Sequence, residues 1–181
     1  MAYFFNTITK QMRQDDGTGL PREDELTNPD LSAVAGIPQT RWIVDGEALR
    51  APNEQETAAF DAADLQAAKV AKMAAIDART AVLVTAGVQV ATGKIISTSV
   101  AATQNLQNLW IGFQQGIVTL PKSISTTDGG TYTIVDNADL IRIAALLRDF
   151  QLNILEGGQD LRADVLACTT LAEVAAVEDN R

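Results

Sequence analysis

The sequence predicts an α+β protein in which a long N-terminal stalk helix leads into a small domain of helices and two short β-hairpins. Residues 54–86 contain neither Gly nor Pro and are rich in alanine, the best helix former. Two later segments alternate apolar and polar residues around glycine turns, as hairpins do. Two others carry apolar residues at helical spacing. We therefore expect an irregular arm at 1–52, the long helix at 53–87 and an α+β domain at 88–178.

The arm is expected to contain only short strands. A short strand is predicted within residues 2–9, with Tyr3, Phe5 and Ile8 as its apolar members. Residues 15–38 are dense in Gly and Pro, which break regular elements, so we expect the arm to lie on another surface rather than pack on itself. A hairpin over residues 41–50, turning at Asp45-Gly46, is predicted to follow. With few local partners there, Trp42 is predicted to anchor a partner protein.

The long helix has clear ends. Asn53 and Glu56 form a capping-box pattern, and Gly87 stands where a left-handed C-cap belongs. A helix over 54–86 would be about 50 Å long. Its apolar residues step by three and four, which predicts self-association as a coiled coil or bundle. This self-association seam consists of Phe60, Ala63, Ala67, Val70 and Ala74.

Two alternatives qualify that interpretation of the helix. Alanine is also frequent simply because it favours helices, so the row need not face a partner. A second stripe, confined to the later half of the helix, is predicted to pack on the domain that follows. Its members are Met73, Ile76, Leu83 and Val84.

The domain is expected to alternate hairpins and helices. Hairpins are predicted at 88–96 and 124–135. Between them, a helix capped by one of Ser97, Thr98 or Ser99 runs to about Gly116 and places Trp110 on its core face. A third helix, capped by Asp136, is predicted to end before Gly157-Gly158 and to be the most buried element. Two short helices complete the chain, one near 159–167 and one capped by Thr170 with Glu173.

Composition argues against most chemistry. The chain has no histidine, so the commonest general base and transition-metal ligand are missing, and Cys168 is its single cysteine. The pairs Asp61/Asp64 and Asp77/Thr80 are expected to be solvated surface groups. The acidic run at 15–19 lacks the ligand spacing of a calcium loop and is expected to be a turn. We predict no catalytic residue, no metal site and no cofactor.

The charge of the chain limits its partners. A formal charge of −9, from 23 acidic and 14 basic residues, disfavours nucleic acid and anionic membranes. No stretch approaches the ~18 apolar residues of a membrane span, and no signal peptide is recognised. We therefore expect a soluble protein with no small-molecule substrate.

The C-terminal two-thirds of the chain resembles a family of unknown function carried by bacteriophages among tail-fibre and virion genes. The resemblance covers about residues 65–178 and rests on pattern. It is carried by the alanine-rich segment 75–80, by Leu106, Asn108 and Trp110, and by segments 126–132, 139–140 and 171–177. Residues 42–49 are in addition similar to the starts of many small tail-fibre-region proteins.

The resemblance implies a phage setting and no catalytic residues. It suggests a structural tail protein at the fibre, fibre adaptor or baseplate, located in the virion and, during assembly, in the host cytoplasm. The partners would be copies of itself, with a trimer expected because fibres are commonly threefold, and other phage tail proteins. A tail-fibre assembly chaperone is the alternative, and a carboxylate glycan hydrolase is a remote third.

Overall fold

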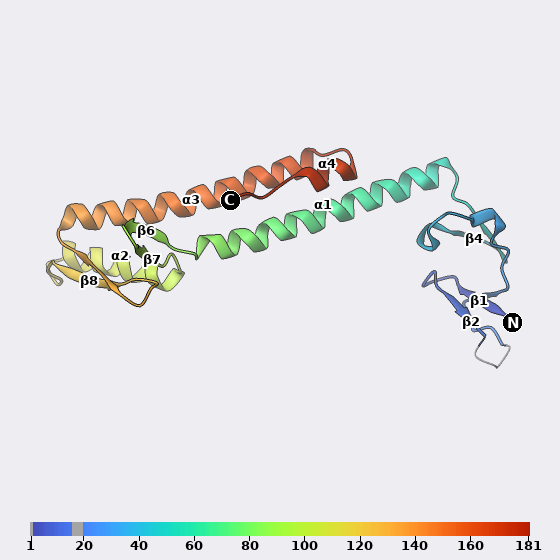
Figure 1. Ribbon diagram of the computed structural model, residues 1–181, viewed down its shortest axis with the longest axis horizontal. Coiled ribbons are helices and arrows are strands. Elements are labelled where there is room, and N and C mark those ends of the chain that lie inside the picture. The colour runs from blue at the N-terminus through green and yellow to red at the C-terminus, as the bar shows by residue number, and fades with distance from the viewer. Residues whose placement is uncertain (1, 16–19) are drawn as a thin grey trace. The chain divides into compact units, whose positions relative to one another are not determined.

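The computed structural model describes residues 2–15 and 20–181 (Figure 1). The protein combines helices with small antiparallel sheets, as the α+β prediction requires. Two compact units divide the chain, Met1–Gln66 and Ala67–Arg181. The boundary falls inside the long helix α1 (Glu54–Val84) rather than at one of its ends.

The first unit is built from short antiparallel strands. A three-stranded sheet has β1 (Tyr3–Asn6) between β2 (Met12–Gln14) and β3 (Glu25–Thr27). The 3₁₀ turns η1 (Ser32–Val34) and η2 (Gln39–Arg41) follow. The predicted hairpin is confirmed as β4 (Ile43–Asp45) and β5 (Ala48–Arg50), with Gly46 in the left-handed region at its turn.

The first unit packs on itself, so the expectation that this segment has no packing of its own is wrong. Phe5, Val34, Trp42 and Leu49 are buried together as a small core. Phe4, which was not among the apolar residues named for the first strand, is buried as completely as Phe5. The Arg13 guanidinium lies 4.4 Å from the Phe4 ring and is held by Glu25 at 2.6 Å. Scattered apolar residues in a loop-rich segment were therefore sufficient for a core.

Helix α1 begins as predicted. Glu56 N donates to Asn53 Oδ1 and Asn53 N donates to Glu56 Oε2, both at 2.8 Å, which completes a capping box. The helix ends two residues earlier than expected, and Gly87 has a φ of +101°. Its later stripe is covered as predicted: Ile76 is buried, and Met73, Leu83 and Val84 are half-buried.

The second unit follows the predicted order of hairpins and helices. Strands β6 (Val88–Ala91) and β7 (Lys94–Ile96) form the first hairpin, and β8 (Lys122–Ser125) and β9 (Thr131–Ile134) the second. Between them, Ser99 caps α2 (Val100–Gln114). Asp136 caps α3 (Asn137–Ala167), and a capping box of Thr170 and Glu173 opens α4 (Leu171–Ala176).

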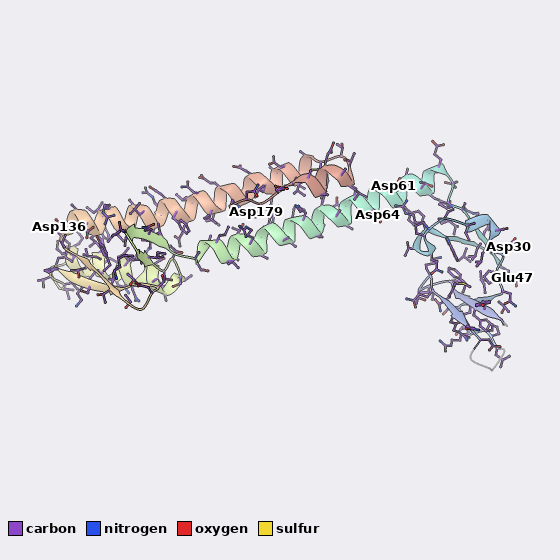
Figure 2. All side chains as sticks on the ribbon, viewed as in Figure 1. Asp30, Glu47, Asp61, Asp64, Asp136 and Asp179 are labelled. Carbon is purple, nitrogen blue, oxygen red and sulfur yellow. The ribbon has the colours of Figure 1, made fainter. Side chains whose placement is uncertain are left out.

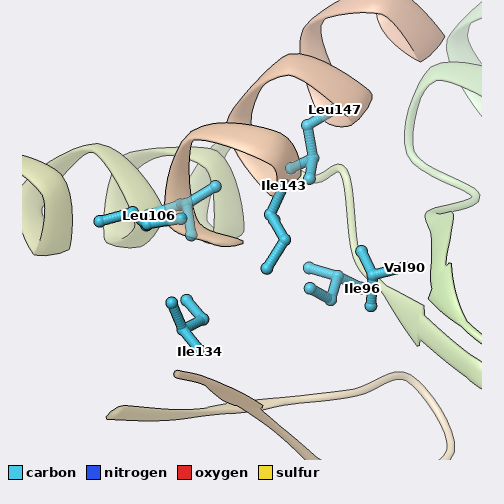
Figure 3. Packing of buried hydrophobic residues seen from close by; sticks show 7 residues of the cluster. Val90, Ile96, Leu106, Ile134, Ile143 and Leu147 are labelled. Carbon is cyan, nitrogen blue, oxygen red and sulfur yellow. The ribbon is translucent and has the colours of Figure 1, made fainter. Parts of the chain in front are cut away.

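The core of the second unit joins both hairpins to α2 and α3. Side chains from five elements point into one space (Figure 3). Leu140, Ile143 and Leu147 lie one helical turn apart on α3, so a single face of that helix covers the hairpins. The remaining members are Val90, Ile96, Leu106 and Ile134.

Helix α3 differs from the prediction at Gly157-Gly158. The helix continues through both glycines to Ala167, so the helix expected at 159–167 is part of α3. The reason is packing against α1: a Cβ at Gly158 would lie 2.8 Å from Thr80 Oγ1. Only glycine allows this approach between the helices, and the tertiary contact outweighs the helix-stopping tendency of the pair.

Candidate functional site

The carboxylate pair Asp61 and Asp64 binds an arginine. Arg41 Nη1 donates to Asp61 Oδ1 at 2.7 Å, and Arg41 Nη2 donates to Asp64 Oδ2 (Figure 2 labels both acids). These two hydrogen bonds raise the pKa of the Arg41 guanidinium, and the bond to Asp64 makes the larger contribution. The pair was expected to be merely solvated. Both carboxylates are indeed exposed, 61% and 53% by side-chain area, and their contact with Arg41 in addition holds η2 against the first turns of α1.

The second pair, Asp77 and Thr80, is also engaged in contacts between helices. Asp77 accepts a hydrogen bond from Arg162 of α3. Thr80 Oγ1 donates to Ile76 O at 2.8 Å and accepts from Arg181 Nη2 at 2.9 Å. Both side chains therefore join α1 to segments that follow it in the second unit.

In the part of the chain that the structure describes, neither a metal site nor a membrane-spanning helix is found. Across residues 2–15 and 20–181, no three His, Cys, Asp or Glu side chains are grouped as a metal site would require. Of the acidic run 15–19, residues 16–19 lie outside the described residues. No helix among the described residues is long and apolar enough to cross a membrane.

Cys168 is a half-buried free thiol at the end of α3. Its Sγ donates to Asp164 O at 3.2 Å, one turn earlier. This contact is local to the helix end and brings no base or second nucleophile to the sulfur.

The environments of the two tryptophans are the reverse of those predicted. Trp42, predicted to be short of local partners, is only 6% exposed. Its ring centroid lies 5.3 Å from that of Phe5, and its Nε1 donates to Ile37 O at 2.8 Å. That premise was wrong, because Trp42 is a core residue of the first unit. We do not propose it as an anchor.

Trp110, expected in a core, is 45% exposed on α2. It borders a groove of about 310 Å³ between α2 and α3. The groove is lined mainly by apolar atoms, and Thr103 Oγ1 beside it is buried without a hydrogen-bond partner among the described residues. The core face of α2 is formed by Leu106, Leu109 and Phe113, and Trp110 lies at the edge of that face, beside the groove.

The predicted self-association seam lies on the uncovered side of α1. Ala63, Ala67, Val70 and Ala74 are exposed, and Val70 is 53% exposed. Phe60 is half-buried, with the Arg41 guanidinium 5.9 Å from its ring centroid. These residues lie opposite the stripe around Ile76, so α1 has one covered face and one open apolar face.

A second exposed apolar row, on α3, was not predicted. The helix was expected to be the most buried element, but Ile141, Leu152, Leu155 and Leu166 are 45–57% exposed. The signal was in the sequence: these four apolar residues stand at alternating three- and four-residue steps with Ala145, Arg148, Gln159 and Arg162. It was hidden because α3 is apolar on more than one side.

Comparison with protein-family models, with curated proteins and with solved structures finds no match to this chain.

Proposed function

We propose that this protein is a non-enzymatic structural component of a bacteriophage tail, acting by protein–protein assembly at the fibre, a fibre adaptor or the baseplate. The observation that carries the assembly role is the open apolar face of α1, where Val70 is 53% exposed between alanines that are exposed as well. Apolar residues repeated at heptad spacing on an exposed face are the pattern by which helices associate. The phage setting comes from the resemblance over residues 65–178.

The contacts of the acidic residues support an assembly role over catalysis. A carboxylate that acts as an acid or base needs access to a substrate and a suitable pKa. The arginine contacts hold Asp61 and Asp64 in a structural role. Asp179 is likewise paired with Arg181 at 2.6 Å, which lowers the pKa of the aspartate. We therefore do not retain the glycan hydrolase.

The proposed partners are copies of this chain and other tail proteins. A net charge of −9 disfavours binding to the phosphate backbone of nucleic acids. In this proposal the protein assembles in the host cytoplasm and remains in the virion.

A second candidate, a tail-fibre assembly chaperone, is favoured by the groove beside Trp110. An exposed tryptophan next to an apolar groove of about 310 Å³ is suited to holding a segment of a client protein. A chaperone would leave the particle after assembly, whereas a structural component would stay.

Mass spectrometry of purified phage particles separates the two candidates. The structural role predicts peptides of this chain in the particle at a fixed ratio to the other tail proteins. Peptides found only in the infected-cell lysate would overturn it in favour of the chaperone. As a control, particles should be treated with high salt first, so that adhering protein is not counted.

A further inference from the structure

We propose that the second unit pairs with a second copy of itself through one two-helix face, on which the leucine row of α3 packs against the alanine row of α1 in the partner. This inference rests on the proposed assembly role and identifies the partner and the surface. The α1–α3 face, as we call it, comprises Ala67, Val70 and Ala74 of α1 and Leu152, Leu155 and Leu166 of α3.

The two rows lie on the same side of the helix pair. Val70 and Asp77 are one heptad apart on α1, and Leu155 and Arg162 are one heptad apart on α3, so each pair shares a flank of its helix. Asp77 and Arg162 form a salt bridge. Because that bridge joins the two flanks, both rows face the same way. Lys69 Nζ also donates to Leu166 O at 2.7 Å.

The opposite side of the helix pair is covered by the chain's own C-terminal segment. On α1, Arg79 follows Asp77 by two residues, and on α3, Gly157 follows Leu155 by two residues. Each therefore lies about 200° around its helix axis from that residue of the face. Arg79 Nε is 3.5 Å from Asp179 Oδ1, and a Cβ at Gly157 would lie 3.0 Å from Arg181 Cδ. Arg181 Nη1 also donates to Ile154 O at 2.8 Å. The described chain thus covers one side and leaves the apolar rows on the other.

Charge favours a second copy as the occupant. The chain carries a net charge of −9, so two copies repel wherever acidic residues predominate. Within the heptad rows of the α1–α3 face, Asp77 is neutralised by Arg162, and Arg148 by Asp149 at 2.7 Å. Along these rows the charged side chains are paired within each chain, so two identical acidic chains meet little charge repulsion there.

Side-chain size also favours a second copy. The α1 row is mainly alanine and lets another helix approach closely, while the α3 row presents leucines that need a surface to cover them. A twofold axis places the leucines of each copy on the alanines of the other, so both rows are satisfied by one symmetric contact.

The face is large enough for a stable pair. From Ile141 to Leu166 the α3 row is about 38 Å long, and two adjacent helices are about 20 Å wide. Beyond the end of α1, Arg148 and Trp110 continue the face, since both line the groove between α2 and α3. The resulting area is on the order of 750 Å² per copy, close to the ~800 Å² typical of specific interfaces.

Sedimentation velocity and native mass spectrometry of the full chain test the proposal. The expected species is a dimer of the 19.3-kDa chain. Leu152→Glu/Leu155→Glu and Ala67→Lys/Ala74→Lys should each raise the dissociation constant at least about 100-fold, because a desolvated unpaired charge is costly. Val82→Glu is the matched control: Val82 is 68% exposed, lies about 140° around α1 from Asp77 and should leave the dimer intact. Circular dichroism checks that each variant retains its helices.

Mixing the two dissociated variants tests the arrangement itself. If α3 of one copy meets α1 of the other, the glutamate and lysine variants should form a heterodimer, since one contact is then native and the other pairs opposite charges. No heterodimer would overturn the arrangement. A monomeric or trimeric wild-type chain would overturn the proposed pair, as would a dimer insensitive to the α3 variant. None of these results bears on whether the chain is present in phage particles, which tests the proposed function separately.

Discussion

At the scale of single residues, Gly158 occupies a position that leaves no room for a Cβ. It lies on α3 opposite Thr80, and Arg181 reaches the same point to donate to Thr80 Oγ1 at 2.9 Å. A side chain there would meet Thr80 Oγ1 and Arg181 Nη1, each at 2.8 Å. Thr80 is β-branched and hydrogen-bonded to its own helix, so it yields little. The packing of α1 on α3 therefore depends on the missing Cβ.

Gly158→Ala should destabilise the second unit by about 1–3 kcal/mol, the usual cost of overpacking, although alanine is the better helix former by about 1 kcal/mol. Gly157→Ala is the matched control. Its Cβ would meet only the flexible Arg181 side chain, so it should be neutral or stabilising. Urea denaturation followed by circular dichroism measures both. Equal effects of the two substitutions would contradict this account, and adding Thr80→Ala should reduce the cost of Gly158→Ala.

Single residues were also where sequence reasoning was weakest. In the sequence, Trp110 stands on an apolar helical face and Trp42 in a segment with few local partners, yet Trp42 is 6% and Trp110 45% exposed. Burial of Trp42 depends on Phe5, Val34 and Leu49, which come from separate turns and strands. Contacts between segments distant in sequence leave no periodic trace, so they could not be predicted from spacing.

At the scale of elements, the sequence was a much better guide. Helix starts have local causes, and the caps at Asn53, Asp136 and Thr170 were predicted from the residues themselves. The hairpins at 88–96 and 124–135 were found by the same local reasoning. The end of α3 was missed because a glycine pair signals either a helix stop or a close helix contact. The distinction depends on α1, far away in sequence.

The start of α1 also gives the clearest dependence on pH. Glu56 has a pKa lowered from 4.5 to about 2, first by its hydrogen bond to Arg50 and then by the backbone N–H of Asn53. A lowered folded-state pKa stabilises the fold above the unfolded pKa, and this stabilisation is lost as the pH falls from about 4.5 towards 2.

Glu56→Gln should therefore make the free energy of unfolding depend less on pH over that pH range, because the neutral amide does not titrate. Urea denaturation at pH 7, 4 and 3, followed by Trp42 fluorescence in a Trp110→Phe background, measures it. Glu54→Gln, in the same first turn, is the control. An acid dependence unchanged in Glu56→Gln would contradict the assigned role of the pair with Arg50.

At the scale of the whole molecule, two cores are built by separate stretches of chain. The first uses Phe5, Val34, Trp42 and Leu49, and the second uses seven buried residues from Val90 to Leu147. The boundary falls within α1, between Gln66 and Ala67. A three-part division was expected because a long helix stands out in a sequence as an element of its own. In the structure, each part of that helix belongs to a unit.

Two cores in one chain predict two unfolding transitions, and each unit contains one tryptophan to report them. In Trp110→Phe, the remaining Trp42 is shielded and should be quenched little by acrylamide, whereas in Trp42→Phe the 45% exposed Trp110 should be quenched readily. During urea denaturation, the fluorescence of Trp42 should change at a lower urea concentration than that of Trp110, because the smaller core buries less apolar surface.

The substitution Trp42→Phe removes the donor to Ile37 O. It should destabilise the first unit by about 1–2 kcal/mol and lower the midpoint of the first transition, while the Trp110 transition stays in place. Circular dichroism follows the first transition in that variant. Coincident midpoints for the two tryptophans would mean that the units unfold as one, and the separation of the cores would then be wrong as a description of the energetics.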